Sequence, residues 1–117
     1  MKEIRNAIID STFLGTEDHG IFTFMLALKW GNCGQGFGGY ALDTPLRDKD
    51  DKFVRRVGTA YGMEVIIQLL ETLGIESWEK LPKTPVRIEC DYSKIYRIGH
   101  LIEDKWFDME KIIKRGE

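Results

Sequence analysis

One segment of the 117-residue sequence has the apolar spacing of a long helix, and the fold must be built around it. The segment follows Thr59, a residue type that suits a helix N-cap, and ends at Gly74, a common helix stop. Between these two positions, apolar residues recur at helical spacing: Met63, Ile66, Ile67, Leu70 and Leu73. Because the remaining segments are typical of strands, we expect this helix to pack on a β-sheet.

Strand-like segments and turns fill the chain before the helix. Ile4–Leu14 is rich in β-branched and aromatic residues, and the turn formers of Gly15–Gly20 should reverse the chain. The run Ile21–Trp30 is almost entirely apolar, which predicts a strand buried on both faces, in the sheet centre or under a partner subunit. After a turn at Gly31–Gly34, the glycine-rich stretch Gly36–Leu42 returns as a strand or a loop.

Two further segments are predicted to be a loop and a hairpin. The charged stretch Thr44–Phe53 is expected to be a solvated loop. After the helix, Val86–Cys90 and Lys94–Leu101 are expected to pair as a hairpin that turns at Asp91-Tyr92-Ser93.

Two short helical segments complete the predicted order. One is a turn at Ser77–Lys80, and the other is a final helix over Met109–Lys114 that starts at an Asp108 cap. The order of three strands, a helix, two strands and a helix is typical of the α+β class. We therefore predict an antiparallel β-sheet packed by one long and one short C-terminal helix, with residues 1–117 forming a single domain.

Charge and composition exclude several classes of protein. The net charge of −2 and the pI of about 5.7 argue against non-specific binding of DNA or RNA, which requires an excess of cations. No apolar run is long enough to span a membrane, and no signal peptide is evident, so we expect a cytoplasmic protein. Cys33 and Cys90 are expected to be reduced thiols, and two histidines (His19 and His100) are too few for a clustered zinc site, so no metal or cofactor is predicted.

A glycine cluster is the first candidate for ligand binding. Gly31, Gly34, Gly36, Gly38 and Gly39 lie within nine residues and are interleaved with Gln35, Phe37 and Tyr40. Such a stretch can bring backbone N–H groups close to a ligand while aromatic rings offer a stacking surface. The alternative is a bulged hairpin in which the glycines serve only the chain geometry. The sequence favours neither reading.

The second candidate is a pair of arginines before the long helix. Arg55 and Arg56 precede a helix start whose unpaired N–H groups and positive dipole end suit an anion. Arginine also makes bidentate contacts with phosphate. The alternative role is neutralisation of the acidic stretch that comes before them. We favour a phosphate site here.

The third candidate is the C-terminal stretch from Tyr92 to Phe107. Strand alternation places Tyr96, Ile98 and His100 on one face, with Arg97 on the other, and Lys105 follows. Aromatic and cationic side chains together suit a surface that stacks a ring and holds a phosphate. Each of these residues taken alone is more often structural.

Catalytic arrangements are weakly supported. Ser11, Asp18 and His19 lack a nucleophile elbow, and a Cys33–His19 pair has nothing beyond residue identity in its favour. We therefore expect binding without catalysis.

Five sequence blocks carry a resemblance to a known family. They are Ile4–Ile9, Glu17–Ile21, Gly34–Tyr40, Arg56–Gly62, and Ile98–His100 together with Lys105–Phe107. In this order and over nearly the whole chain they resemble the phage-encoded Thoeris anti-defence protein 1 family. Members of that family bind the cyclic ADP-ribose isomers made by bacterial TIR-domain defence proteins and sequester them intact. Some members also bind cyclic oligonucleotides at a separate site.

The resemblance implies a cytoplasmic sponge acting in the infected bacterial cell, where it blocks TIR-based defence. It implies a homodimer or higher homo-oligomer with the ligand pocket at a subunit boundary. The ligand would be a cyclic ADP-ribose isomer, with cyclic di- or trinucleotides as further candidates. The matching blocks and the C-terminal turn give the candidate ligand-binding residues: Phe37, Arg56, Thr59, Tyr92, Arg97, His100 and Lys105.

Two other functions remain open at this point. The chain could be an enzyme that cleaves such signalling nucleotides, or an inhibitor that binds a host protein through an apolar surface.

Overall fold

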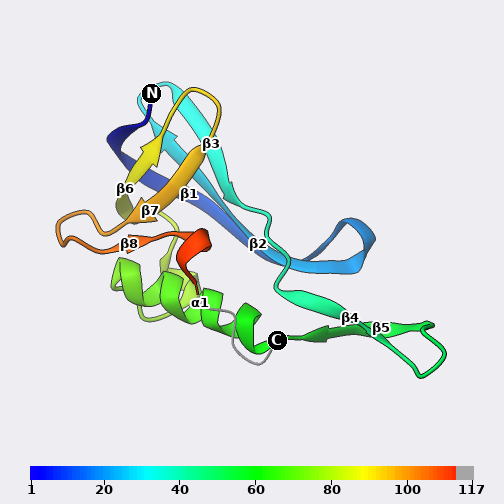
Figure 1. The fold of residues 1–117 in the computed structure, drawn as a ribbon. Coiled ribbons are helices and arrows are strands. Elements are labelled where there is room, and N and C mark those ends of the chain that lie inside the picture. Colours follow the sequence, from blue (N-terminus) through cyan, green and yellow to red (C-terminus); the bar gives the residue numbers. More distant parts are fainter. Residues whose placement is uncertain (113–117) are drawn as a thin grey trace.

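A computed structural model describes residues 1–112 of the chain and has an α+β fold, as predicted (Figure 1). The strands in chain order are β1 (Glu3–Glu17), β2 (Ile21–Trp30), β3 (Cys33–Gly38), β4 (Asp43–Arg47), β5 (Phe53–Gly58), β6 (Pro85–Cys90), β7 (Ile95–Gly99) and β8 (Trp106–Phe107). The α-helix is α1 (Ala60–Leu73), and short 3-10 turns lie at η1 (Asp18–Gly20), η2 (Trp78–Lys80) and η3 (Met109–Lys111). None of the helices within residues 1–112 has both the length and the apolar character needed to cross a membrane.

Six strands form one antiparallel sheet in the order β3-β2-β1-β6-β7-β8. The long strand β1 joins its two halves, because residues before Ile8 pair with β6 and residues after Ile8 pair with β2. The pairing with β2 shifts by one residue at Asp10, which lies in a bulge. The sheet curls so that β3 meets β7, and the Gln35 Nε2 donates a hydrogen bond to the Ser93 carbonyl (2.6 Å).

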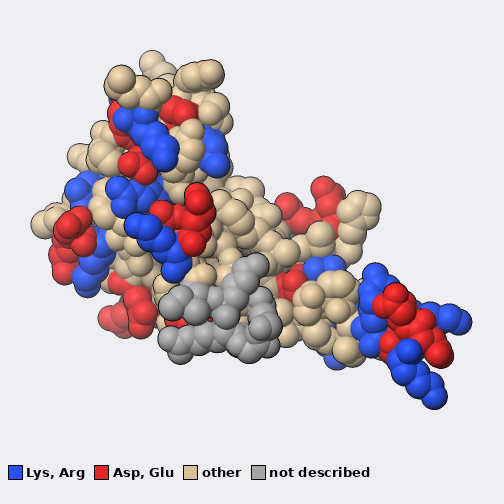
Figure 2. Space-filling view, viewed as in Figure 1, with Lys and Arg blue, Asp and Glu red and all other residues tan. Residues whose placement is uncertain are grey.

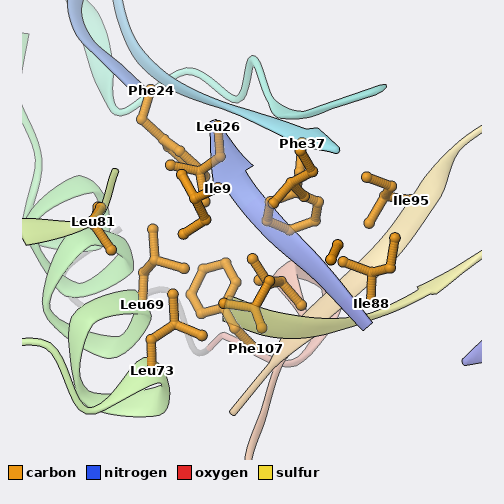
Figure 3. Packing of buried hydrophobic residues seen from close by; sticks show 14 of the residues in the cluster. Ile9, Phe24, Leu26, Phe37, Leu69, Leu73, Leu81, Ile88, Ile95 and Phe107 are labelled. Atoms are coloured by element: carbon orange, nitrogen blue, oxygen red, sulfur yellow. The ribbon is translucent and has the colours of Figure 1, made fainter. Parts of the chain in front are cut away.

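The core lies between the concave side of this sheet and α1 (Figure 3). From the sheet, Phe24, Leu26 and Phe37 contribute large buried side chains, and Leu69 and Leu73 of α1 point toward them. Strand β2 is buried on this side, whereas its other face is only partly covered, with Met25 and Ala27 half-buried. Burial on both faces, predicted from its apolar run, is therefore incomplete in the single chain.

The predicted helix is confirmed together with both of its caps. The Thr59 side chain accepts a hydrogen bond from the backbone N–H of Gly62, and Gly74 ends the helix in the left-handed conformation (φ 69°). Its buried face is lined by Gly62, Val65, Leu69 and Leu73. Met63 and Ile67, which share the predicted apolar spacing, stay exposed instead, so the helix carries more apolar surface than the core uses.

The prediction of a solvated loop over Thr44–Phe53 is wrong. Strands β4 and β5 pair through this region, and only the tip between Arg47 and Phe53 is a loop. Within the tip, the Asp48 carboxylate accepts hydrogen bonds from the backbone N–H groups of Asp50 and Lys52, which fixes the turn. These strands were not predicted because their side chains show no alternation of buried and exposed positions, which is the pattern that marks a strand in a sequence.

The hairpin of β4 and β5, which we call the arm, projects away from the sheet and the helix (Figure 1). It accounts for the elongated shape of the molecule, whose principal extents are 52, 30 and 25 Å. Lysine, arginine and aspartate side chains gather at the tip of the arm, whereas in this view the surface at its base is mostly made of other residue types (Figure 2).

The C-terminal region differs from its prediction in two respects. The Asp108 side chain accepts a hydrogen bond from the Glu110 backbone N–H, as expected of a cap, but the helix it starts is the single 3-10 turn η3. The rest of the predicted Met109–Lys114 helix lies partly outside the described residues. The two-residue strand β8, which was not predicted, precedes this turn and closes the sheet edge.

Candidate functional site

A cavity of about 500 Å³ lies where the arm meets the first residues of α1, the C-terminal end of β1 and the N-terminal end of β2. Most of its wall is apolar, from Leu14, Phe22, Leu42, Val57, Met63 and Ile66. Four polar side chains join them: Thr16, Asp43, Arg56 and Thr59. A mainly apolar hollow of this size with a few fixed polar groups is typical of small-molecule sites.

Arg56 lies in the cavity wall but is held by a partner that the sequence did not suggest. Its Nε donates to Asp43 Oδ2 (2.9 Å) and its Nη2 donates to Asp43 Oδ1 (2.8 Å), which makes a bidentate ion pair. The pair is largely shielded, with 21% of the Arg56 side chain and 8% of the Asp43 side chain exposed. The hydrogen bonds from Arg56 hold the pKa of Asp43 below its usual range.

Thr59 also lies in the cavity wall, and its hydroxyl has two structural partners. The hydroxyl donates to the Leu42 carbonyl (3.0 Å) and accepts from the Gly62 backbone N–H (2.8 Å). These two hydrogen bonds connect the start of α1 to the segment that leads into the arm.

The same junction explains why a glycine stands at position 62. A Cβ placed there would come within 1.9 Å of the Leu42 carbonyl oxygen, so the helix can approach this segment only without a side chain. Part of the Arg56–Gly62 block is therefore needed for local geometry, whatever it binds.

The predicted glycine cluster does not line this cavity. Gly34, Gly36 and Gly38 of β3 pair with β2, and the N–H of Gly39 donates to the Phe24 carbonyl (2.7 Å). A side chain at Gly36 would press against Met25, with its Cβ 2.9 Å from the Met25 sulfur. These contacts support the second interpretation, in which the glycines serve the chain geometry by allowing β2 and β3 to pack closely.

Phe37 is placed in the core and not at a ligand surface. Only 2% of the residue is exposed, and its ring packs against Phe24, Tyr40 and Phe107 at centroid distances of 6.1–6.3 Å. The expected stacking of a ligand on this ring is not supported, because the ring is closed to solvent in the single chain.

Arg97 belongs to a cluster on the outer face of β6, β7 and β8. Its Nε donates to Glu89 Oε1 (3.0 Å), and its guanidinium lies 4.3 Å from the centroid of the Trp106 ring. Arg87 also lies over that ring, at 4.9 Å. A Cβ at Gly99 would come 2.7 Å from the ring, which explains the glycine in the Ile98–His100 block.

His100 and Lys105 are engaged in the loop between β7 and β8. The His100 Nδ1 accepts hydrogen bonds from the backbone N–H groups of Ile102 (3.1 Å) and Glu103 (3.0 Å). The Lys105 Nζ lies 3.4 Å from Glu103 Oε1. Both side chains therefore have local roles in this loop.

Tyr92 is 99% exposed at the turn between β6 and β7 and borders a different hollow, beside Trp30 and Arg5. The structure thus separates the seven candidate residues. Arg56 and Thr59 share the cavity at the arm, Phe37 is buried, and the other four lie around β6, β7 and β8.

The carboxylate of Asp91 organises the turn that carries Tyr92, and it provides a pH-dependent prediction. It accepts hydrogen bonds from the Ser93 hydroxyl (2.6 Å), the Tyr96 hydroxyl and the backbone N–H groups of Ser93 and Lys94. These bonds, chiefly that of the Ser93 hydroxyl, hold the pKa of Asp91 well below its usual range. A lowered carboxyl pKa stabilises the fold above the pKa of the unfolded chain, about 3.9, and the stabilisation is lost as the pH falls below that value.

Asp91→Asn is therefore expected to lower the urea midpoint at pH 6, and the gap to the parent protein should narrow toward pH 3. Asp104→Asn removes an equal charge from an exposed position and serves as the control. A gap that stays constant with pH would contradict the proposed role of the Asp91 charge.

Within residues 1–112 no group of His, Cys, Asp and Glu side chains is arranged to hold a metal ion. Cys33 is exposed and Cys90 is buried, and both are free thiols. Sequence reasoning missed Asp43, which is the main partner of Arg56. The two residues are 13 positions apart, and only the pairing of β4 with β5 brings them together.

Comparisons with known proteins identify no relative for this chain. No protein-family model matches the sequence. No curated protein matches it. No solved structure matches the fold.

Proposed function

We propose that this protein is an anti-defence sponge, which binds cyclic ADP-ribose-type signals in the bacterial cytoplasm and sequesters them without degrading them. The observation that carries the proposal is the composition of the cavity at the arm. Two of the five blocks that resemble the Thoeris anti-defence protein 1 family meet there, the Glu17–Ile21 block through Gly20 and the Arg56–Gly62 block through several residues. Residues distant in sequence that converge on one hollow are expected of a binding site.

The chemistry of the cavity suits the proposed ligand. Its apolar wall can cover a purine or a ribose ring, while Thr16 and Arg56, which also line the cavity, offer polar contacts. Among the described lining residues there is no histidine, cysteine, serine or lysine, and the carboxylate present, Asp43, is held by Arg56, which keeps its pKa low and makes it a poor proton acceptor. This supports binding in preference to turnover.

The test is recovery of the ligand. The purified protein is incubated with cyclic ADP-ribose isomers, separated from free nucleotide, heat-denatured, and the released material is identified by mass spectrometry. Intact cyclic nucleotide is the expected result. Release of cleaved nucleotide would identify an enzyme instead. Absence of bound nucleotide together with a co-purifying host protein would favour an inhibitor of that protein.

We propose further that the protein acts as a homo-oligomer, and the arm supports this. A two-stranded hairpin is at best marginally stable in water without another surface to pack on. The arm nevertheless exposes three large apolar residues, Leu46 (43%), Phe53 (58%) and Val54 (52%). Exposed apolar surface of this kind typically marks a protein interface.

The parent protein is expected to elute with the mass of a dimer or larger assembly in size-exclusion chromatography with light scattering. The double variant Phe53→Ser/Val54→Ser should shift it toward the monomer, because it removes the two large exposed apolar side chains of β5. Ile102→Ser, which changes an apolar residue that is 83% exposed in the loop before β8, should leave the mass unchanged. A monomeric parent protein would contradict the proposal.

A further inference from the structure

The positively charged side chain in the cavity wall, Arg56, is already paired with a carboxylate. Arg56 makes two short hydrogen bonds to the Asp43 carboxylate and a longer one from Nη2 to the Asp43 carbonyl (3.4 Å). Asp43 in turn accepts a hydrogen bond from the Phe22 backbone N–H at Oδ2 (3.1 Å). Three elements, β2, β4 and β5, thus hold the pair in place, and neither partner can turn away without losing several bonds.

This arrangement is unfavourable for a diphosphate inside the cavity. Two of the three guanidinium nitrogens of Arg56 are bonded to Asp43, and Nη1 has no partner among the described residues. A phosphate that approached Arg56 would also approach the Asp43 carboxylate, and like charges repel most strongly where water is partly excluded. The ion pair as a whole is neutral, and Asp43 and Arg56 are the charged residues among the described lining of the cavity, so this lining offers no net positive charge to offset the repulsion.

The rest of the wall favours an uncharged occupant. Phe22, Val57, Met63 and Ile66 present apolar surface, and Met63 remains 63% exposed in the single chain. Covering such surface with a flat ring removes apolar area from water and is favourable without any charged contact.

We infer that Asp43 determines which part of a nucleotide this cavity accepts: the uncharged nucleoside enters, and the diphosphate stays at the mouth. The inference rests on the proposed function and adds a specificity determinant to it. By pairing with Arg56, Asp43 turns a possible phosphate-binding side chain into part of a rigid wall whose two charges cancel.

Competition on the unaltered protein is the first test. Labelled cyclic ADP-ribose is bound at constant ionic strength, and unlabelled adenosine or inorganic pyrophosphate is titrated in. Adenosine is expected to displace the label at a concentration at least about tenfold below that needed for pyrophosphate, which corresponds to about 1.4 kcal/mol. Equal or better competition by pyrophosphate overturns the inference.

The second test removes the charge of Asp43. Asp43→Asn is expected to raise the affinity for pyrophosphate by about tenfold or more, because Arg56 can then make a charge-assisted bond to phosphate. The affinity for adenosine should change by less than about threefold. Asp51→Asn is the matched control, since it removes the same charge from the exposed tip of the arm and should change neither affinity.

The outcomes separate the two proposals. If cyclic ADP-ribose and adenosine do not bind at all, the proposed function fails and the inference fails with it. If they bind, but Asp43→Asn and Asp51→Asn raise pyrophosphate affinity equally, only the inference fails, since the effect is then one of net charge. Should Asp43→Asn not fold, the competition on the unaltered protein decides alone.

Discussion

Replacing Phe37 by alanine is expected to lower the free energy of unfolding by about 3–5 kcal/mol, the range measured for large-to-small changes at buried phenylalanines. The ring is 2% exposed and lies among Phe24, Tyr40 and Phe107, so its removal leaves a cavity in the core. Strand β3 is anchored to the core mainly through this side chain, because its neighbours Gly36 and Gly38 have none. The measurement is a urea denaturation curve at neutral pH.

This experiment also separates two roles for the block that contains Phe37. A ligand-stacking ring would reduce nucleotide affinity when removed, with little change in stability. If the ring belongs to the core, its removal lowers the stability, while the molecules that remain folded bind nucleotide as before. Tyr92→Ala is the control, because that ring is 99% exposed and its loss should leave the urea midpoint nearly unchanged. A Phe37→Ala variant of parental stability would contradict the core packing described above.

Gly62→Ala is expected to destabilise the protein by about 2–3 kcal/mol, although alanine is the better helix former by roughly 1 kcal/mol. The direction of the effect reverses because the added Cβ would come within 1.9 Å of the Leu42 carbonyl oxygen. Leu42 is part of the backbone that leads into the arm, so relief of the clash requires either the helix start or this backbone to move. The Thr59 hydroxyl, which bonds to the same carbonyl, would be displaced as well.

Thermal unfolding followed by circular dichroism provides the measurement. Gly58→Ala is the matched control, since it lies in the same block and nothing stands within 4 Å of the position of an added Cβ. Gly58→Ala should leave the melting temperature nearly unchanged, while Gly62→Ala should lower it by several degrees or more. Because Gly62 also lines the cavity, nucleotide affinity should fall in the folded fraction. An increase in melting temperature for Gly62→Ala would show that the close approach is absent in solution.

Local signals made part of the fold predictable from the sequence. The cap at Thr59, the stop at Gly74 and the hairpin around Asp91 all depend on residues within a few positions of each other, and all three are present. The apolar run of β2 likewise predicts a strand, because its side chains must be removed from water wherever the strand is placed.

The arm and the site were less predictable. Strands β4 and β5 bury little, so their side chains show no pattern, and their pairing appears only in the three-dimensional structure. The candidate residues Arg97 and His100 were selected for their chemical type, yet their partners, Glu89 and the backbone of the β7–β8 loop, already engage them.

The amino-acid sequence was enough to predict the class of fold, the helix with its caps and the residue types available for binding. It could do so because capping, turn formation and apolar periodicity act between near neighbours in the chain. Three outcomes became visible in the three-dimensional fold alone: Phe37 belongs to the core, Arg56 is paired with Asp43, and Arg56 and Thr59 share a cavity that the other candidates do not reach. These outcomes depend on which distant segments meet, and strand pairing and burial set those contacts across the whole chain.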